Sequence, residues 1–166
     1  MGDRISVDKK IVVRIFLLGF LVFILFAIMQ IMDYSLVQSI TLTEVYQEGD
    51  IEWKIDMVRV DRHYAAIAGW AFVPGQEPRN MAVNVVLKNK NTYKAIRLPT
   101  TLVESDTINQ EYPDEIDYSK SGFLARVNKN FLDLEEDSYE IYLEFINQGK
   151  VTYITTNQDL SDSTGE

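Results

Sequence analysis

The 166-residue chain contains no cysteine and a single histidine, His63. The lack of cysteine excludes disulfide bonds, thiolate metal sites, a catalytic thiol and a lipidated cysteine. One histidine cannot build a histidine-rich metal site, and a Ser-His-Asp triad would depend on it alone. The sequence also lacks a G-x-S-x-G element, a dinucleotide fingerprint and a phosphate-binding loop. We therefore expect no enzyme activity, no cofactor and no metal site.

Basic residues are scarce, with 16 Lys and Arg against 25 Asp and Glu, which gives a net charge of −9. Residues 1–14 hold four basic and two acidic residues, so the rest of the chain carries −11. Nucleic-acid binding requires basic residues that neutralise phosphates, and we expect no such partner. The hydrophobic fraction of 46% indicates that the chain folds.

Charged residues are absent from residues 15–32, which belong to a predicted membrane helix spanning residues 11–32. At about 1.5 Å per residue the predicted helix reaches about 33 Å, enough to cross the hydrocarbon core of a bilayer. A cleavable signal peptide usually has an apolar region of about 7 to 15 residues and a small-x-small cleavage site. Residues 26–30 offer no such site. We expect an uncleaved signal anchor inserted in the lipid bilayer.

The basic residues of the N-terminus predict the orientation of this anchor. Basic residues are retained in the cytoplasm, and four of them precede or just enter the apolar segment. We therefore expect a single-pass protein of the cell membrane with a cytoplasmic N-terminus. The predicted parts are a cytoplasmic stub (1–10), the anchor (11–32), a short stalk (33–39), an extracytoplasmic domain (40–157) and a flexible tail (158–166).

Apolar and polar residues alternate through most of the remaining chain, which predicts an all-β domain. Apolar side chains take every second position in residues 51–60, 81–87 and 139–145, and in the first segment the set ends at Met57. Turn residues, among them Asn-Gln-Gly-Lys at 147–150, separate the candidate strands. About eight strands without an amphipathic helix between them predict an antiparallel β-sandwich, immunoglobulin-like or jelly-roll in layout. The further candidates are 41–47, 64–73, 91–98, 122–128 and 150–156.

Two segments do not alternate cleanly. Residues 100–120 read as a strand fragment followed by a long acidic loop, and residues 130–137 as a helical turn or a tight crossover. Closely spaced carboxylates in 104–117 would suit calcium, whose ligands are oxygens. Their spacing differs from that of the D-x-[DN]-x-[DN]-G loop, so we predict a solvated loop, and calcium binding stays open.

Aromatic residues are the candidate ligand-binding groups, because the C–H faces of sugars stack on aromatic rings. Trp70 and Phe72 share strand parity with one candidate, but their apolar neighbours predict that they belong to the core. The acidic loop supplies the candidates that we expect to be most exposed, Tyr112 and Tyr118. The predicted glycan-binding residues are Tyr64, Tyr93, Tyr112 and Tyr118.

Four short segments carry a resemblance that covers roughly residues 51–156. In order, they are Ile-Ala-Gly-Trp-Ala-Phe (67–72), residues 93–97, Ser-Gly-Phe-Leu-Ala-Arg-Val (121–127) and residues 139–143. They resemble the extracytoplasmic β-sandwich domains of small membrane-anchored proteins associated with Gram-positive cell-wall polysaccharide and teichoic-acid glycosyltransferases. That family often shows Arg-x-Asp-Val before the Ser-Gly-Phe element. Here Arg97 is followed by Leu98-Pro99, and Asp106 lies further on.

The resemblance implies a non-catalytic accessory role in the assembly or modification of cell-surface polysaccharide. The implied partner is a cell-wall glycan or a multi-span membrane glycosyltransferase. The alternative from a different class is a structural or adhesive surface module that binds another protein.

The predicted orientation has a direct test. A protease added to intact cells should remove everything after about Ser39, because the basic stub holds the N-terminus inside. Immunoblotting with tags at the two termini measures this. Full protection of the domain would reverse the orientation, and a soluble form starting near Gln30 would show that the anchor is cleaved.

Overall fold

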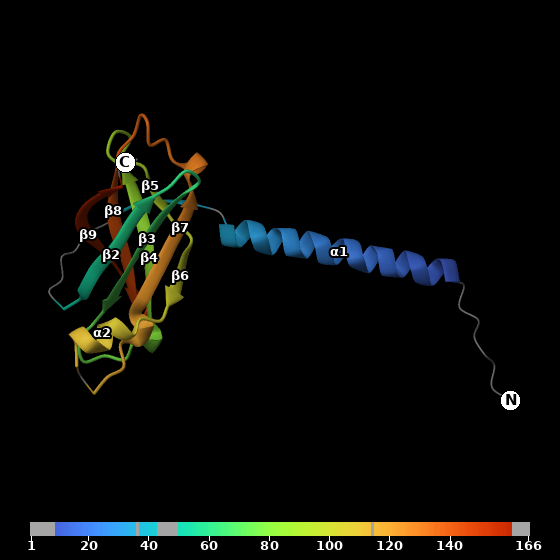
Figure 1. Ribbon diagram of the computed structural model, residues 1–166. Helices are drawn as coiled ribbons and strands as arrows, with labels where there is room; N and C mark the ends of the chain where they lie inside the picture. Colours follow the sequence, from blue (N-terminus) through green and yellow to red (C-terminus); the bar gives the residue numbers. More distant parts are fainter. Residues whose placement is uncertain (1–8, 36, 43–49, 114, 161–166) are drawn as a thin grey trace. The chain divides into compact units, whose positions relative to one another are not determined.

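The computed structural model describes residues 9–35, 37–42, 50–113 and 115–160. The chain divides into two compact units, Met1–Leu36 and Val37–Glu166 (Figure 1). The first unit contains a single long helix, and the second contains two β-sheets with short helical turns between their strands.

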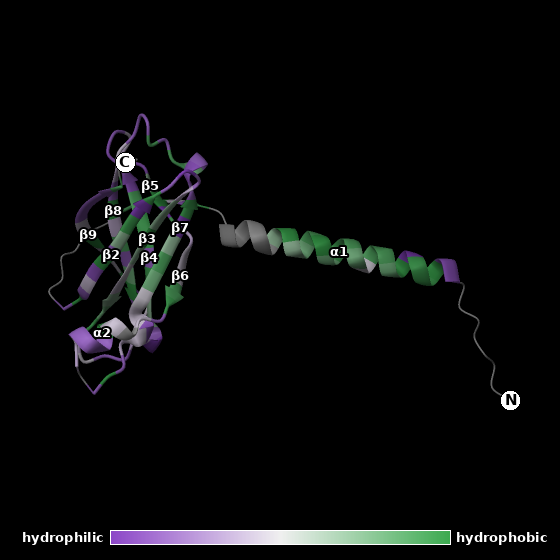
Figure 2. Ribbon diagram, viewed as in Figure 1, coloured by the Kyte–Doolittle hydropathy of each residue, from purple (hydrophilic) through white to green (hydrophobic). Residues whose placement is uncertain are grey.

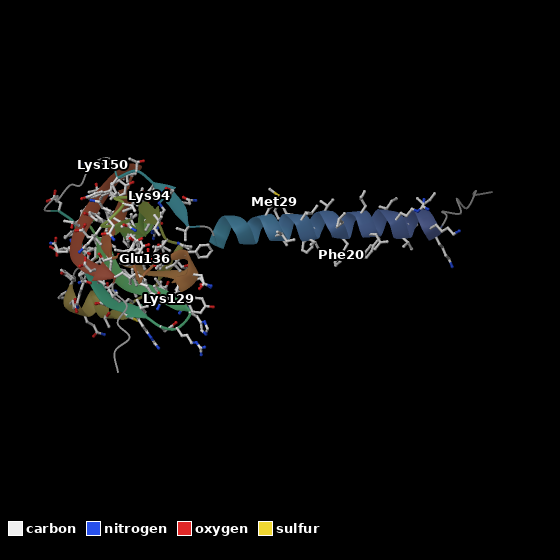
Figure 3. All side chains as sticks on the ribbon, turned by 90° about the horizontal axis from the view of Figure 1, so that it is seen from above. Phe20, Met29, Lys94, Lys129, Glu136 and Lys150 are labelled. Carbon is white, nitrogen blue, oxygen red and sulfur yellow. The ribbon has the colours of Figure 1, made fainter. Side chains whose placement is uncertain are left out.

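Helix α1 (Lys9–Ser35) is apolar on all sides. Figure 2 shows mostly hydrophobic residues over Lys9–Met29, with hydrophilic ones near the beginning of the helix. Phe20 and Met29 project from opposite sides of the helix in Figure 3. The span Lys9–Met29 is long and apolar enough to cross a membrane, and none of it is buried. A helix without a polar face needs an apolar surrounding, so α1 fits a single-pass membrane anchor.

The strands of the second unit form two antiparallel sheets that face each other (Figure 1). This arrangement confirms the predicted β-sandwich. The first sheet, sheet A, has the order β1 (Gln38–Ile40), β5 (Ala95–Arg97), β4 (Met81–Asn89), β8 (Tyr139–Asn147) and β9 (Lys150–Leu160). The second, sheet B, has the order β2 (Glu52–Val60), β3 (Tyr64–Phe72), β7 (Gly122–Asn128) and β6 (Thr100–Val103).

Short helical segments connect several strands. Three of them are 3-10 turns, and one is the helix α2 (Asp106–Glu111), which follows β6 where an acidic loop was expected. The 3-10 turns are η1 (Pro78–Asn80), η2 (Ser119–Ser121) and η3 (Lys129–Phe131), and η3 lies at the beginning of the segment where a helical turn was expected.

The core between the sheets comes from alternating positions of the two central strands of sheet A. The predicted inward residues of β4 and β8 are all buried, and the two strands pair along their whole lengths. Each large apolar side chain buried here contributes about 1.5 to 3 kcal/mol. These residues are Met81, Val83, Val85 and Leu87 on β4, and Tyr139, Ile141, Leu143 and Phe145 on β8.

Strand β2 departs from the expected alternation at Asp56. Ile55 pairs with Gly69, and Met57 pairs with the neighbouring Ala68. Asp56 is therefore an extra residue without a partner on β3, and the strand forms a β-bulge there. The extra residue reverses which side chains face the core. Met57 is 38% exposed instead of buried, whereas Val60 is buried. The expectation that Met57 continues the buried set is therefore wrong.

Gly69 allows the chains to approach closely beside this bulge. A Cβ atom at this position would lie 2.1 Å from the backbone carbonyl oxygen of Lys54 and 3.0 Å from Cζ of Phe123. The closer neighbour is backbone and cannot move without disturbing β2, so the position requires glycine.

Both ends of the domain differ from the predicted boundaries. Helix α1 continues to Ser35, and Gln38 and Ser39 already pair with β5, so residues 33–39 are not a stalk. Strand β9 continues to Leu160, which places residues 158–160 in the sheet rather than in a tail. The strands extend beyond the predicted boundaries because pairing with β5 and β8 satisfies backbone N–H and C=O groups, and composition does not reveal such pairing.

Of two other strand predictions, one is shortened and one lies mostly outside the described residues. The strand expected at residues 91–98 is restricted to Ala95–Arg97, because a tight turn precedes it, in which the Asn89 side chain accepts hydrogen bonds from the backbone N–H of Asn91 and Thr92. Residues 43–47 of the strand expected at 41–47 lie outside the described residues.

Replacing Gly69 by alanine should lower the free energy of unfolding of the domain by at least about 2 kcal/mol, because the backbone of β2 would have to move. Denaturation of the full chain in detergent, followed by tryptophan fluorescence, measures this. The control Ala68→Ser changes the neighbouring, half-buried position and should cost less than about 0.5 kcal/mol. Equal stability of Gly69→Ala and the parent would contradict the close approach.

Candidate functional site

Two of the four predicted tyrosines form part of an aromatic cluster. Tyr118 is 1% exposed, and its ring stacks on Phe72 with a centroid distance of 4.1 Å. The Tyr112 ring meets Trp70 and Phe72 edge-on, at 5.4 and 5.1 Å. The Tyr118 hydroxyl accepts a hydrogen bond from the backbone N–H of Gly75 at 2.8 Å. The expectation that Tyr112 and Tyr118 are the most exposed contacts is wrong, since both rings pack onto β3.

The segment around α2 is held against sheet B, which explains why these tyrosines are covered. Ile108 of α2 is fully buried, and Lys54 of β2 pairs with Glu111 at 3.0 Å. Asp117 accepts a hydrogen bond from the Asn109 side chain at 2.7 Å. This bond, followed by the backbone N–H of Ser119, lowers the pKa of Asp117 to about 2. The acidic segment is thus an ordered cover for Trp70 and Phe72.

The described residues of this segment do not bring a set of calcium ligands together. Within the described part of the chain, no three His, Cys, Asp or Glu side chains come together as a possible metal site. His63 does not lie in such a group. It precedes β3, and its ring meets the Tyr64 ring edge-on at 6.4 Å.

The other two predicted tyrosines are exposed but belong to different sheets. Tyr93 is 75% exposed in the turn between β4 and β5 of sheet A, with Lys88 Nζ 5.8 Å from its ring centroid. Tyr64 is 52% exposed at the beginning of β3 in sheet B. The four tyrosines therefore do not form one glycan-binding surface, and Tyr64 and Tyr93 stay separate candidates.

A cleft of about 350 Å³ opens at one end of the sandwich. It lies where β2 begins, β3 ends and the β8–β9 hairpin turns. Side-chain amides and a hydroxyl line it above apolar residues, and we call it the amide cleft. Its lining residues are Asp50, Ile51, Val73, Gln76, Phe145, Asn147, Gln148, Lys150 and Thr152.

The hairpin turn shapes the amide cleft. Asn147 pairs with Lys150, and the two residues between them, Gln148 and Gly149, have φ angles of 51° and 82°. These are the positive angles that a two-residue hairpin of type I′ requires. The turn predicted for residues 147–150 is thus confirmed. The Asn147 side-chain amide donates to Gln76 Oε1 at 3.0 Å, which fixes one wall of the cleft.

A basic row crosses the outer face of sheet B. Arg59 of β2 and Arg126 of β7 both pair with Ala66 of β3, so the three residues lie side by side on one face. Both arginines are exposed. Tyr64 lies two residues before Ala66 on the same strand and therefore on the same face. We call the surface of Tyr64, Arg59, Ala66 and Arg126 the arginine face.

Comparison with protein-family models, curated proteins and solved structures gave no match. The function of the chain must therefore be argued from its own residues.

Sequence reasoning missed both surfaces for different reasons. Residues 147–150 were recognised as a turn, but the packing of Gln76 against them depends on the fold. Arg126 could have been found, because alternation in residues 122–128 places it on the polar side of the strand. Arg59 could not, since unbroken alternation from Ile51 would have directed it into the core.

A buried carboxylate network stabilises the outer face of sheet A. Glu144 is 1% exposed, and its Oε1 atom accepts hydrogen bonds from the Arg97 guanidinium and, at 3.0 Å, from the Tyr153 hydroxyl. Its Oε2 atom accepts from the Asn84 side chain at 2.7 Å. The bond to Glu144 raises the pKa of Arg97, and burial first, then Glu144, raises the pKa of Tyr153.

This network is structural rather than chemical. It joins β4, β5, β8 and β9, and both oxygens of Glu144 already have partners, so the carboxylate is not free to act as a base. Removing one member of such a buried pair typically costs about 3 to 5 kcal/mol. The acidic partner of Arg97 is thus Glu144, 47 residues downstream.

Truncating the tyrosines should separate core from surface. Tyr118→Ala should lower the free energy of unfolding by about 3 to 5 kcal/mol, because it empties the buried position beside Phe72. The control Tyr93→Ala should change it by less than about 0.5 kcal/mol. Thermal and denaturant unfolding of both variants measure the difference. A stable Tyr118→Ala variant would show that the ring does not belong to the core.

Proposed function

We propose that this chain is a non-catalytic, membrane-anchored accessory protein of cell-surface polysaccharide assembly or modification, and that its domain binds glycan. The amide cleft carries this proposal. Its volume of about 350 Å³ lies within the range of small-ligand sites. Its lining combines amide and hydroxyl groups with apolar side chains, and the charged residues Asp50 and Lys150 also line it; sugars are recognised by such polar and apolar groups together.

The chemistry of the lining fits hydroxyl groups. An amide side chain offers both donors and an acceptor, and a sugar hydroxyl also does both, so Gln76, Asn147 and Gln148 can each satisfy one. Ile51 and Val73 are half-buried beside them and can contact the C–H face of a ring. The amides carry no charge, so they lose little on desolvation compared with ionised groups.

The anchor supports a place at the cell surface. The apolar span of α1 begins with Lys9, Lys10 and, one turn later, Arg14, and basic residues are retained in the cytoplasm. This orientation puts the domain on the extracytoplasmic side of the membrane, where surface polysaccharide is assembled. A multi-span glycosyltransferase is the partner that such an accessory protein would serve.

Glycan binding can be measured with the full chain in nanodiscs of phosphatidylcholine. An array of neutral oligosaccharides, followed by calorimetry, should identify at least one bound glycan. The double variant Gln76→Ala/Gln148→Gly removes two amides from the amide cleft, and glycine accepts the positive φ at residue 148. It should reduce the affinity at least tenfold, which corresponds to about 1.4 kcal/mol.

The control for this experiment is Gln110→Ala, which removes an exposed amide on α2. It should leave the affinity within twofold of the parent. Absence of any bound glycan, or equal loss in the control, would refute the role of the amide cleft. Turnover of a glycan by the protein would refute the non-catalytic assignment, and capture of a defined protein without glycan binding would favour an adhesive module.

A further inference from the structure

Arginine is concentrated on one side of an acidic domain. From residue 37 onward the chain has five arginines, and three of them, Arg59, Arg62 and Arg126, belong to the arginine face or to the turn beside it. Neighbouring strands lie about 4.8 Å apart, so the backbones of Arg59 and Arg126 are separated by about 10 Å across Ala66. The alanine between them is too short to obstruct access to either guanidinium.

The arginines of this face form no close ion pair with a carboxylate of the described residues, and the charge of Arg59 acts on Asp61 at more than 4.0 Å. Among the described residues neither Arg59 nor Arg126 forms an ion pair within 4.0 Å. Two acids lie nearby on β2 and in its turn, but each is engaged. Asp56 pairs with Lys54 at 3.5 Å, and Asp61 Oδ1 accepts hydrogen bonds from two backbone N–H groups at 2.9 and 2.8 Å.

Two solvent-exposed guanidinium groups without a close ion pair give this face a local positive charge that suits an anionic ligand, although the net charge of the chain is −9. One arginine binds one phosphate or carboxylate with two parallel hydrogen bonds. Two neighbouring exposed arginines can therefore bind two anionic groups of the same polymer. The charge on this face opposes that of the rest of the domain, so it also directs an anion to this surface.

The residues around the arginines favour a sugar polymer over other anions. The row next to Ala66 is apolar and consists of Met57, Ala68 and Leu124. On the other side Tyr64 presents a ring that is 52% exposed. A polysaccharide with anionic groups offers ring faces for these surfaces and charges for the arginines. An anionic lipid surface is typically bound by clusters of about four to eight Lys and Arg residues, whereas this face and its adjoining turn have the three arginines Arg59, Arg62 and Arg126.

We propose that the arginine face binds the anionic groups, phosphate or carboxylate, of a polysaccharide chain. The proposal rests on the glycan-binding function for the nature of the polymer, but it concerns a second site. The arginine face lies toward the end of sheet B where β3 begins, whereas the amide cleft lies where β3 ends. From Ala66 to Val73 the distance along the strand is roughly 20 Å.

The test uses the full chain in phosphatidylcholine nanodiscs and three soluble polymers of similar length. These are poly(glycerol phosphate), oligogalacturonate and neutral dextran, which separate phosphate, carboxylate and uncharged ligands. The parent should bind at least one anionic polymer more tightly than dextran. Arg59→Gln/Arg126→Gln should weaken that binding at least tenfold and flatten its dependence on salt between about 50 and about 200 mM.

A matched control changes the same charge elsewhere. Lys94→Gln/Lys120→Gln removes two exposed cations from other surfaces and should change the affinity less than twofold. Equal losses in the two double variants would show a general charge effect and overturn the proposal. An unchanged affinity of the arginine variant, with folding verified by circular dichroism, would also overturn it.

Two further outcomes distinguish this site from the amide cleft and from lipid. If the amide-cleft variant weakens neutral glycans while the arginine variant binds every polymer normally, the proposed function stands and the anionic site does not. If no soluble polymer binds, but the arginine variant loses attachment of the domain to nanodiscs with anionic lipid, lipid headgroups are the ligand and the polysaccharide proposal fails.

Discussion

The β-bulge of β2, beside its close approach to β3 at Gly69, determines which side chains of β2 the outer face of sheet B presents. Gly69 has no side chain, so the carbonyl of Lys54 can lie where a Cβ atom would otherwise stand. The bulge at Asp56 follows immediately along β2 and reverses the alternation of the strand. Val60 then contributes to the core, and Arg59 points to solvent. The place of Arg59 in the arginine face depends on this single irregularity.

A second layer covers the other half of the same face. Helix α2 and the segment after it bury Trp70 and Phe72 beneath Tyr112 and Tyr118. The outer face of sheet B therefore has a covered half, rich in aromatic rings, and an open half with two arginines. Tyr64 lies at the beginning of the strand that also carries Trp70 and Phe72, but it is beyond the reach of this cover and stays exposed.

The outer faces of the two sheets differ in whether their charged side chains form ion pairs. On sheet A, Glu144 and Arg97 neutralise each other within a network of hydrogen bonds. On sheet B, Arg59 and Arg126 face solvent without a close ion pair among the described residues. Breaking the buried pair would leave an uncompensated charge, whereas the exposed arginines stay available to attract and orient a charged partner.

The sequence by itself determined the membrane helix, the β-sandwich and most of the core. Length and unbroken hydrophobicity are local properties of residues 11–32, and alternation in 81–87 and 139–145 is a local property of strands with one buried face. The hairpin turn at 147–150 was equally readable, because its conformation depends on Gly149 and its immediate neighbours. Local patterns were sufficient wherever one strand or one helix decided the outcome.

Only the tertiary structure decided where the aromatic residues and the charges lie. Tyr118 belongs to a polar segment, but it becomes core because α2 folds back onto β3, a contact between residues far apart in the chain. Arg59 follows an alternating run, but it faces solvent because β2 bulges where Gly69 lies on the adjacent strand. Gln76 reaches Asn147 across 71 positions. Each case depends on a neighbour that sequence proximity does not identify, since burial and pairing are set by contacts between strands.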